Sequence, residues 1–249
     1  MSTVSWPEVV GIGMGVGFVS GLFGKGGSAI ATPLLHLAGV PAIVALAAPL
    51  PATIPSTLAA GAAYWRGRYI DRQVFLWSLA FGVPATAAGA LATRWIDGAI
   101  LIGVTDVVIA LLGLRFLLAP SHCEEGGPRP TAYRLRLAAV ATLVGVASGL
   151  LANSGGFLLA PLYLTVLRLP IKKAFATSLA VASVLALPGT LVHWRLGHID
   201  WHLVLVFGAA SVPLSYLGAR VALRTDAVRL ERLYGAALVG LGVALLAFR

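Results

Sequence analysis

Two glycine-rich polar segments interrupt an otherwise apolar sequence, and their residue types are suited to binding an anion. The first reads Gly-Leu-Phe-Gly-Lys-Gly-Gly-Ser over residues 21–28, and the second reads Gly-Leu-Leu-Ala-Asn-Ser-Gly-Gly over residues 149–156. Each leads into a short apolar segment, 27–39 or 156–168, that can form a half-helix. Because the first N–H groups and the positive dipole end of a helix favour negative charge, both breaks are predicted to face an anion.

The predicted substrate site combines these breaks with hydroxyl groups on two later segments. Lys25 supplies a positive charge to the first break, and Asn153 supplies neutral donors at the corresponding place in the second. The alternative is that the glycines serve close helix packing and that the hydroxyls simply hold helices together. The candidate substrate-binding residues are Gly24, Lys25, Gly26, Gly27, Ser28, Asn153, Ser154, Gly155, Gly156, Ser56, Thr57, Thr177 and Ser178.

Two further residues are candidates for coupling transport to protons. Asp106 is the only acid deep within an expected membrane span, where an acid is by default a functional candidate, although pairing with Lys25 or with a hydroxyl is an equally plausible structural role. His36 could relay protons near neutral pH or could lie at the outer interface. A metal site among the histidines of the outer loop, residues 193–202, is disfavoured because its carboxylate support is limited. We therefore predict neither a metal nor a cofactor.

The composition indicates an integral membrane protein. Of the 249 residues, 59% are hydrophobic and 11% are charged, and the mean hydropathy is +0.92. An ordinary soluble domain is about one quarter charged. Apolar segments long enough for spanning helices cover nearly the whole chain, so soluble enzymes and nucleic-acid binders are disfavoured. The net charge of +9 is then explained by basic loops that orient a membrane protein.

The sequence contains two copies of one unit. Residues match at an offset of 128 around the breaks and at an offset of 129 after one insertion, with Trp, Arg, Asp, Pro and Gly agreeing in order. Examples are Gly17 and Gly145, Gly21 and Gly149, Pro41 and Pro170, Trp65 and Trp194, and Asp71 and Asp200. We predict a first transmembrane repeat over 1–119, a polar linker over 120–134 and a second repeat over 135–249.

Positive charge predicts how the repeats are oriented. Each repeat is expected to hold a Gly-broken re-entrant or short helix pair followed by three spanning helices. If each broken pair turns back, nearly all Lys and Arg residues share one face, with only Arg94, Arg195 and Arg249 on the other. This bias predicts inverted-topology repeats in the cytoplasmic (inner) membrane, with the linker cytoplasmic and both termini outside. The expected spanning segments are 42–65, 73–93, 98–118, 173–194, 201–222 and 232–248.

The sequence resembles the TauE/SafE sulfite exporter family, also called the 4-toluene sulfonate uptake permease family. The resemblance rests on GLFGKGGSAIATPLL and its echo GLLANSGGFLLAPLY, on Pro41 and Pro170, and on Gly-Arg-Tyr-Ile-Asp and Gly-His-Ile-Asp after the third segment. It covers nearly the whole chain, and it implies transport of sulfite, thiosulfate, sulfonates or related small organic anions, usually without ATP. The second break departs from the family's glycine pattern at Ala152 and Ser154.

The sequence as a whole predicts an all-α polytopic secondary transporter with its site at the interface of the two repeats. Its expected partners are a small anionic substrate and the lipid bilayer, with no nucleic acid, and a homo-oligomer is left open. The alternative is a nonenzymatic membrane channel or subunit without a saturable substrate site. A membrane enzyme is disfavoured, because paired acids, a Ser–His pairing or a His-rich metal set would be needed within the membrane.

Overall fold

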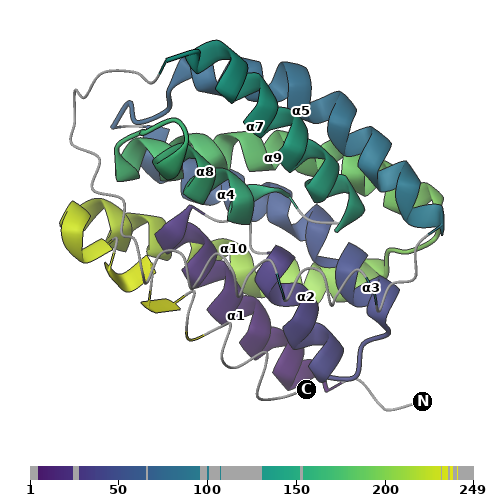
Figure 1. The fold of residues 1–249 in the computed structure, drawn as a ribbon. Coiled ribbons are helices and arrows are strands. Elements are labelled where there is room, and N and C mark those ends of the chain that lie inside the picture. The colour runs from purple at the N-terminus through teal and green to yellow at the C-terminus, as the bar shows by residue number, and fades with distance from the viewer. Residues whose placement is uncertain are drawn as a thin grey trace.

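The computed structural model describes residues 5–24, 28–65, 67–95, 100, 107, 131–151, 154–230, 232–234, 236–237 and 240. These parts of the chain form helices, and they contain no strand (Figure 1). The helices are α1 Trp6–Phe23, α2 Ser28–Leu37, α3 Ala42–Ala47, α4 Pro49–Trp65, α5 Arg72–Ala92, η1 Thr93–Trp95, α7 Tyr133–Leu150, α8 Gly156–Thr165, α9 Ile171–Arg195 and α10 Trp201–Arg224.

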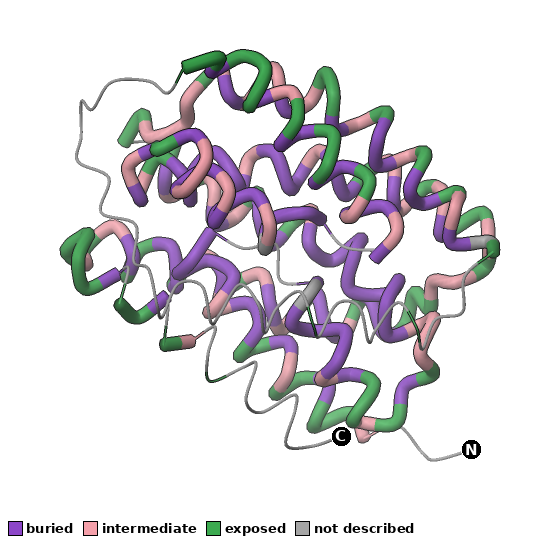
Figure 2. Tube along the Cα trace, viewed as in Figure 1, coloured by how far each residue is buried: buried purple, intermediate pink, exposed green. Residues whose placement is uncertain are grey.

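Six apolar helical segments in the described residues are long enough to cross a membrane, which confirms the all-α polytopic fold. They are α1, the combined α3–α4 segment, α5, α7, α9 and α10. Two of them are central, because 61% of the apolar window is buried in α3–α4 and in α9, against 33–44% in the others (Figure 2). The expected spans 98–118 and 232–248 fall outside the described residues, apart from positions 100, 107, 232–234, 236–237 and 240.

The segments that follow the two breaks form half-helices of the expected kind. Helices α2 and α8 have 10 residues each, which at 1.5 Å per residue gives about 15 Å, half of a hydrocarbon core of about 30 Å. The expected span 42–65 is divided at Ala48 into α3 and α4. Prolines explain this division, because Pro49 and Pro51 lack the N–H groups that would continue the helical hydrogen bonds.

Glycines allow two pairs of helices to pack backbone against backbone. In the α1–α10 contact, a Cβ atom added to Gly21 would collide with the backbone of Ser215. In the α5–α7 contact, a Cβ atom on Gly149 would collide with the backbone of Thr86. These two contacts join corresponding positions of the two halves, since Gly21 matches Gly149 and Thr86 matches Ser215 in the offset comparison. Each half therefore packs its first helix against a helix of the other half.

The contacts also fix the directions of the helices. Helices α1, α4 and α10 run in one direction, and α5, α7 and α9 run in the opposite direction. In Figure 1, α5 and α7 lie together along the upper side, α1 and α10 lie along the lower side, and α4 and α9 cross between them. Each direction follows from two contacts along a pair of helices. Parallel pairs are α1 and α10 (Gly17–Ser211, Gly21–Ser215), α4 and α10 (Ala52–Gly208, Ser56–Ser211), α5 and α7 (Gly82–Gly145, Thr86–Gly149), and α5 and α9 (Gly82–Leu185, Thr86–Gly189). Helices α4 and α9 are antiparallel, because Leu50 lies at Gly189 and Asp71, after the end of α4, lies at Thr177.

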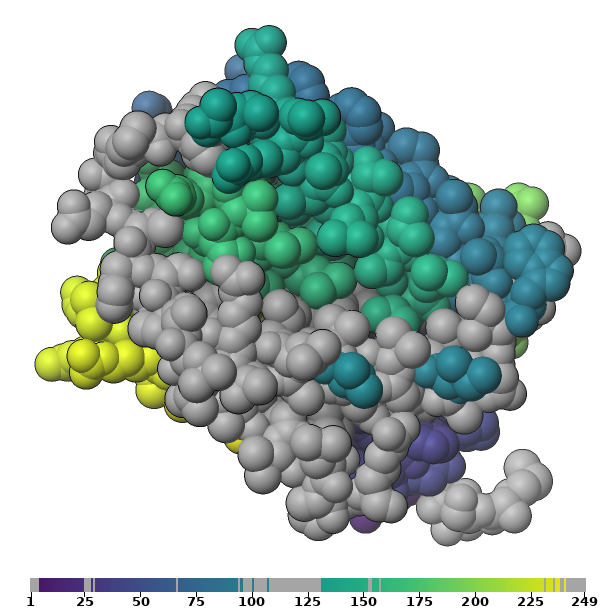
Figure 3. Space-filling model, in the orientation of Figure 1, coloured from purple at the N-terminus to yellow at the C-terminus, as the bar shows by residue number. Residues whose placement is uncertain are grey.

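The molecule thus has two ends, which we name the Trp6 end, where α1 and α10 begin, and the Arg72 end, where α5, α7 and α9 begin. Exposed tryptophans lie at both ends, as expected for interfacial belts: Trp65 lies at the Arg72 end, and Trp6, Trp95, Trp194 and Trp201 lie at the Trp6 end. Most cations lie at the Arg72 end, and those in the described residues are Arg68, Arg72, Arg134, Arg136, Arg168, Lys172, Lys173, Arg220, Arg224, Arg229 and Arg232. The space-filling view shows α5 and α7 forming the upper rim of one face (Figure 3).

Candidate functional site

The two breaks approach each other inside the bundle. The backbone N–H of Ser154 donates a hydrogen bond to Oγ of Ser28, with an N···O distance of 3.1 Å. Ser28 is the first residue of α2, and Ser154 stands two residues before α8. Both residues are fully buried, with 0% of their surface exposed. The N-terminal ends of the two half-helices therefore meet in the interior, although they belong to different halves of the sequence.

The far ends of the half-helices lie at opposite ends of the molecule. Leu35 of α2 belongs to one apolar cluster with Val9 and Leu203, which stand near the starts of α1 and α10. Tyr163 of α8 is hydrogen-bonded through its hydroxyl to Oγ of Ser78 on α5, at 2.6 Å. Helix α2 therefore runs from the interior toward the Trp6 end, and α8 runs from the interior toward the Arg72 end.

Gly24 fixes the start of the first break. It ends α1 with a φ of 64°, and its N–H donates to the carbonyl of Ser20. A Cβ atom at this position would lie 2.5 Å from Cα of Phe175 on α9, so the close approach of two backbones requires glycine. The carbonyl of Gly24 accepts a hydrogen bond from Oγ of Ser178 at 2.6 Å. Ser178 is therefore a residue that attaches the first break to the central helix α9.

Gly155 fixes the end of the second break. It has a φ of 73°, and its carbonyl accepts hydrogen bonds from the N–H groups of Leu158 and Leu159 at 3.0 and 2.9 Å. A Cβ atom would lie 2.9 Å from Cγ1 of Val144 on α7. The first residues of α8, beginning with Gly156, carry the N–H groups that a helix start leaves without intrahelical acceptors. These groups lie beside the Ser28–Ser154 contact.

The side chain of Ser154 has unused hydrogen-bonding capacity. Its Oγ atom is buried, and it has no hydrogen-bond partner among the residues that the structure describes. The neighbouring hydroxyl of Thr32 donates instead to the carbonyl of Ser28, at 3.0 Å within α2. A buried hydroxyl without a partner costs about 1–3 kcal/mol relative to its hydration in water. A ligand with acceptor oxygens beside the Ser28–Ser154 contact would therefore gain a hydrogen bond from this atom.

Ser56 and Thr57 form contacts of another kind. Oγ of Ser56 lies 2.8 Å from Oγ of Ser211, and the backbone carbonyl of Ser56 accepts a hydrogen bond of 2.7 Å from Oγ of Ser215. Thr57 donates to the carbonyl of Thr53, 2.7 Å away in the same helix. Ser56 therefore joins α4 to α10, whereas the hydroxyl of Thr57 bonds within α4. The sequence analysis did not single out Ser211 and Ser215.

The remaining predicted residues are Thr177, His36 and five that the structure does not describe. Oγ1 of Thr177 accepts a hydrogen bond of 3.0 Å from the N–H of Asp71, so it holds the α4–α5 connection against α9. His36 is exposed at the end of α2 that is remote from Ser28, and its Nδ1 lies 3.1 Å from the carbonyl of Val40. The candidates that lie outside the described residues are Lys25, Gly26, Gly27, Asn153 and Asp106.

His193, in the last turn of α9, forms a pair with His198 after the helix. Nδ1 of the fully buried His193 lies 3.0 Å from Nδ1 of His198, so one ring donates a hydrogen bond to the other. His202 instead packs edge-on against the ring of Trp6, with 4.6 Å between ring centroids. Within the described ranges, no group of three or more His, Cys, Asp or Glu residues could hold a metal ion.

Comparison with known proteins identifies the family. The chain matches the family model described as "Sulfite exporter TauE/SafE" over residues 9–245. The chain belongs to the TauE/SafE family. The resemblance inferred from the two breaks is therefore confirmed, and the TauE/SafE assignment covers both halves of the chain and both half-helices.

Curated relatives agree with the TauE/SafE assignment. Two proteins of Xylella fastidiosa, each named "Probable membrane transporter protein", are 31% and 30% identical over 246 residues, which cover 94% of this chain and 93% of each relative. A Bacillus subtilis protein with a similar name is 24% identical over 242 residues, covering 88% of this chain and 87% of that protein. No solved structure is significantly similar to the chain. The family and these names support a membrane transporter.

Proposed function

We propose that the protein is a secondary transporter that moves a small anion across the cytoplasmic membrane. The substrate class is sulfite, thiosulfate, a sulfonate or a related organic acid. The observation that carries this proposal is the buried contact of Ser154 with Ser28, where the starts of α8 and α2 meet. We place the substrate beside this contact, at the interface of the two halves.

The local electrostatics favour an anion there. Each half-helix directs its first N–H groups toward the contact, and each start of a helix stabilises a nearby negative charge by about 0.3–2 kcal/mol, depending on burial. The free hydroxyl of Ser154 adds a donor in the same place. Lys25 lies three residues before Ser28 in the sequence, and we propose that it supplies the charge that balances the substrate.

We further propose that 1–119 and 135–249 are inverted repeats that rock against each other around this site. Two features support the inversion. The corresponding helices of the two halves, such as α1 and α7, run in opposite directions, and their glycine contacts occur in matching pairs. The concentration of cations at the Arg72 end supports a cytoplasmic position for that end and for the linker 120–134, with both termini outside.

The test is the flux of radiolabelled sulfite, thiosulfate and a small sulfonate into proteoliposomes that contain the purified full-length protein. Saturable flux of one of these anions, inhibited by the unlabelled anion, is the expected result. Flux that rises linearly with concentration would instead favour a channel. Flux equal to that of protein-free vesicles for all three anions would contradict the proposed substrate class.

We also propose that Asp106 couples transport to protons, with His36 as a relay at the outer end of α2. Asp106→Asn is then expected to abolish the acceleration of uptake by an imposed pH gradient while leaving exchange of substrate for substrate intact. His36→Gln is expected to slow gradient-driven uptake without abolishing it. An unchanged response to the gradient in Asp106→Asn would overturn this assignment.

A further inference from the structure

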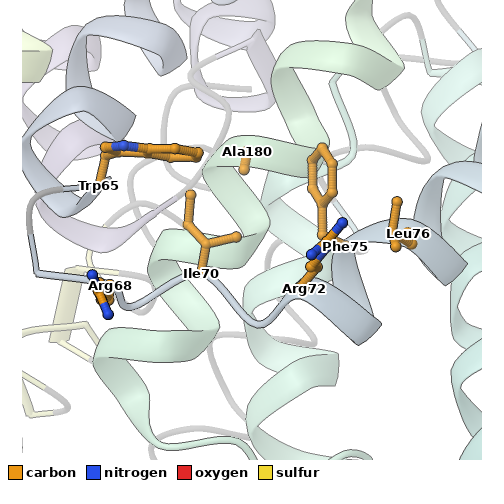
Figure 4. A pocket seen from close by; sticks show the side chains of 7 residues that line it. All are labelled: Trp65, Arg68, Ile70, Arg72, Phe75, Leu76 and Ala180. Carbon is orange, nitrogen blue, oxygen red and sulfur yellow. The ribbon is translucent and has the colours of Figure 1, made fainter.

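An open groove lies on the side of the bundle at the Arg72 end, and none of the residues that line it belongs to the Ser28–Ser154 contact. It has a volume of about 820 Å³, and it lies between the end of α4, residues 68–70 of the following loop, the start of α5 and Ala180 of α9. In Figure 4 the side chains of Trp65, Ile70 and Phe75 point toward Ala180, whereas Arg68 and Arg72 lie on the side of the loop. The groove therefore combines an apolar surface with two cations, which lie on either side of Ile70 in Figure 4.

The apolar part of the groove faces outward from the bundle. Trp65 is 72% exposed and Leu76 is 52% exposed, although both stand in helices that are apolar enough to span a membrane. Side chains of this kind, close to the basic end of a spanning helix, are expected at the level where acyl chains meet headgroups. A free inorganic anion would gain nothing from this surface, whereas an acyl chain would.

The two arginines of the groove are available for a ligand. Both side chains are exposed, and neither forms an ion pair with a carboxylate within the part of the chain that the structure describes. The nearest acid in the sequence, Asp71, is engaged in another contact, because its Oδ1 accepts the N–H of Val74 at 3.0 Å and so caps α5. A phosphate group would match the charge and the donors of the two guanidinium groups.

The corresponding connection at the Trp6 end keeps the apolar residues but not the cations. Trp65 and Ile70 are matched by Trp194 and Ile199, and the turns have the same form, since the N–H of Arg68 donates to the carbonyl of Trp65 and that of Gly197 to Trp194. Arg68 is thus matched by glycine, and Arg72 is matched by Trp201. The pair of cations is a feature of the Arg72 end.

Arg68, unlike Arg72, has an unfavourable backbone conformation. Arg68 has a φ of 55°, in the left-handed region that disfavours residues with a Cβ atom, and its counterpart Gly197 has a φ of 73°. The same replacement occurs in the other turn at this end, where Arg168 has a φ of 54° and its counterpart Gly39 a φ of 87°. A positive side chain is therefore present at the basic end despite an unfavourable backbone conformation.

From these observations we propose that the groove binds an anionic phospholipid of the leaflet at the Arg72 end. The phosphate of the headgroup contacts Arg68 and Arg72, and one acyl chain lies along Trp65, Phe75 and Leu76. Basic pockets beside spanning helices on the cytoplasmic side are suited to such headgroups. This site is independent of the proposed substrate site, because it uses other residues and lies on the outer surface of the bundle.

The test is native mass spectrometry and thermal stability of the purified full-length protein with added phosphatidylglycerol, compared with phosphatidylcholine of the same acyl chains. The groove variant is Arg68→Gln with Arg72→Gln. The control is Arg224→Gln with Arg229→Gln, which removes two exposed cations of the same end outside the groove. We expect phosphatidylglycerol to bind more tightly than phosphatidylcholine, and the groove variant alone to lose about tenfold or more of that binding.

Three outcomes would overturn the proposal. Equal binding of the two lipids would remove the role of the phosphate charge, and an equal loss in the control variant would show attraction by net charge alone. Stabilisation by glycerol phosphate, at the concentration where phosphatidylglycerol acts, would show a site for a free anion rather than for a lipid.

A single substitution separates lipid binding from folding. Arg68→Gly relieves the left-handed backbone conformation, so the lipid-free protein is expected to unfold at a higher temperature than the wild type. The same change removes a phosphate contact, so the additional rise in unfolding temperature caused by phosphatidylglycerol is expected to shrink. An undiminished rise in Arg68→Gly would contradict the assignment of Arg68, and such a result could not be attributed to a damaged fold.

Discussion

At the scale of single residues, Gly24 and Gly155 make the breaks possible, and each does so for two reasons. Both adopt positive φ values, of 64° and 73°, and both lie against a neighbouring helix where a Cβ atom has no room. Gly155 contacts the side chain of Val144, which can move slightly, whereas Gly24 contacts the backbone of Phe175, which cannot. Substitutions at Gly24 are therefore expected to be the more damaging.

Gly155→Ala tests this geometry against a matched control. The free energy of unfolding is expected to fall by about 2 kcal/mol, because backbone strain adds to overpacking against Val144. Gly197 has the same φ of 73° but no heavy atom within 4 Å of an added Cβ, so Gly197→Ala is expected to lose only the strain, about 1 kcal/mol. Equal losses in the two variants, measured by unfolding in detergent, would show that the packing of the second break is not tight.

The pair of His193 and His198 predicts a pH dependence of stability. Burial lowers the pKa of His198 below its usual value, so the folded protein favours the neutral ring. Stability from this group is present above the ordinary histidine pKa and is lost as the pH falls through the lowered one. The unfolding temperature is expected to drop between pH 7.5 and 5.5, and to drop less in His198→Gln. The same pH dependence in both proteins would exclude a contribution from His198.

At the scale of elements, the helix contacts decide which glycines are structural. Gly21 of α1 lies against the backbone of Ser215 on α10, whereas nothing lies within 4 Å of a Cβ added to Gly15 of the same helix. Gly21→Ala is expected to lower the free energy of unfolding by about 3 kcal/mol, because no flexible side chain can move aside. Gly15→Ala is expected to raise it by up to about 1 kcal/mol through helix propensity. Thermal unfolding of the two variants in one detergent measures the difference, and a stable Gly21→Ala would contradict the packing.

Some features of the helices and breaks could be predicted from the sequence, and others could not. The half-helices were predictable, because a Gly-rich break followed by a segment too short to span leaves few alternatives. The division at Ala48 was signalled by Pro49 and Pro51, although the prediction treated 42–65 as one span. The hydrogen-bond partners of Ser56 and Thr177 were not predictable, because residue type does not say which helix a hydroxyl will face. The structure shows that these partners are Ser211 and the N–H of Asp71.

At the scale of the whole molecule, the two halves are interleaved rather than adjacent. Helix α1 packs on α10 and α7 packs on α5, so each half contributes to the packing of the other. The half-helices start together in the interior and diverge toward the Trp6 and Arg72 ends. This arrangement gives a closed centre that a movement of one half against the other could open alternately to each side of the membrane, as alternating access requires.

The distribution of charge predicts the orientation of the molecule. Cys123, in the linker outside the described residues, is the only cysteine of the chain. If the Arg72 end is cytoplasmic, a membrane-impermeant maleimide is expected to label Cys123 in inside-out vesicles but not in intact cells. The control is labelling after detergent treatment, which exposes both faces. Labelling in intact cells would reverse the proposed orientation.

The central claim is that an anion binds at the contact of Ser28 with Ser154, and Ser154→Ala tests it most directly. The lost hydroxyl has no partner in the described structure, so the variant is expected to be at least as stable as the wild type while its KM for anion uptake rises about tenfold. Ser183→Ala is the control, because that hydroxyl, also buried, donates only within α9, to the carbonyl of Ala180. An unchanged KM in a stable Ser154→Ala protein would contradict a site at this contact.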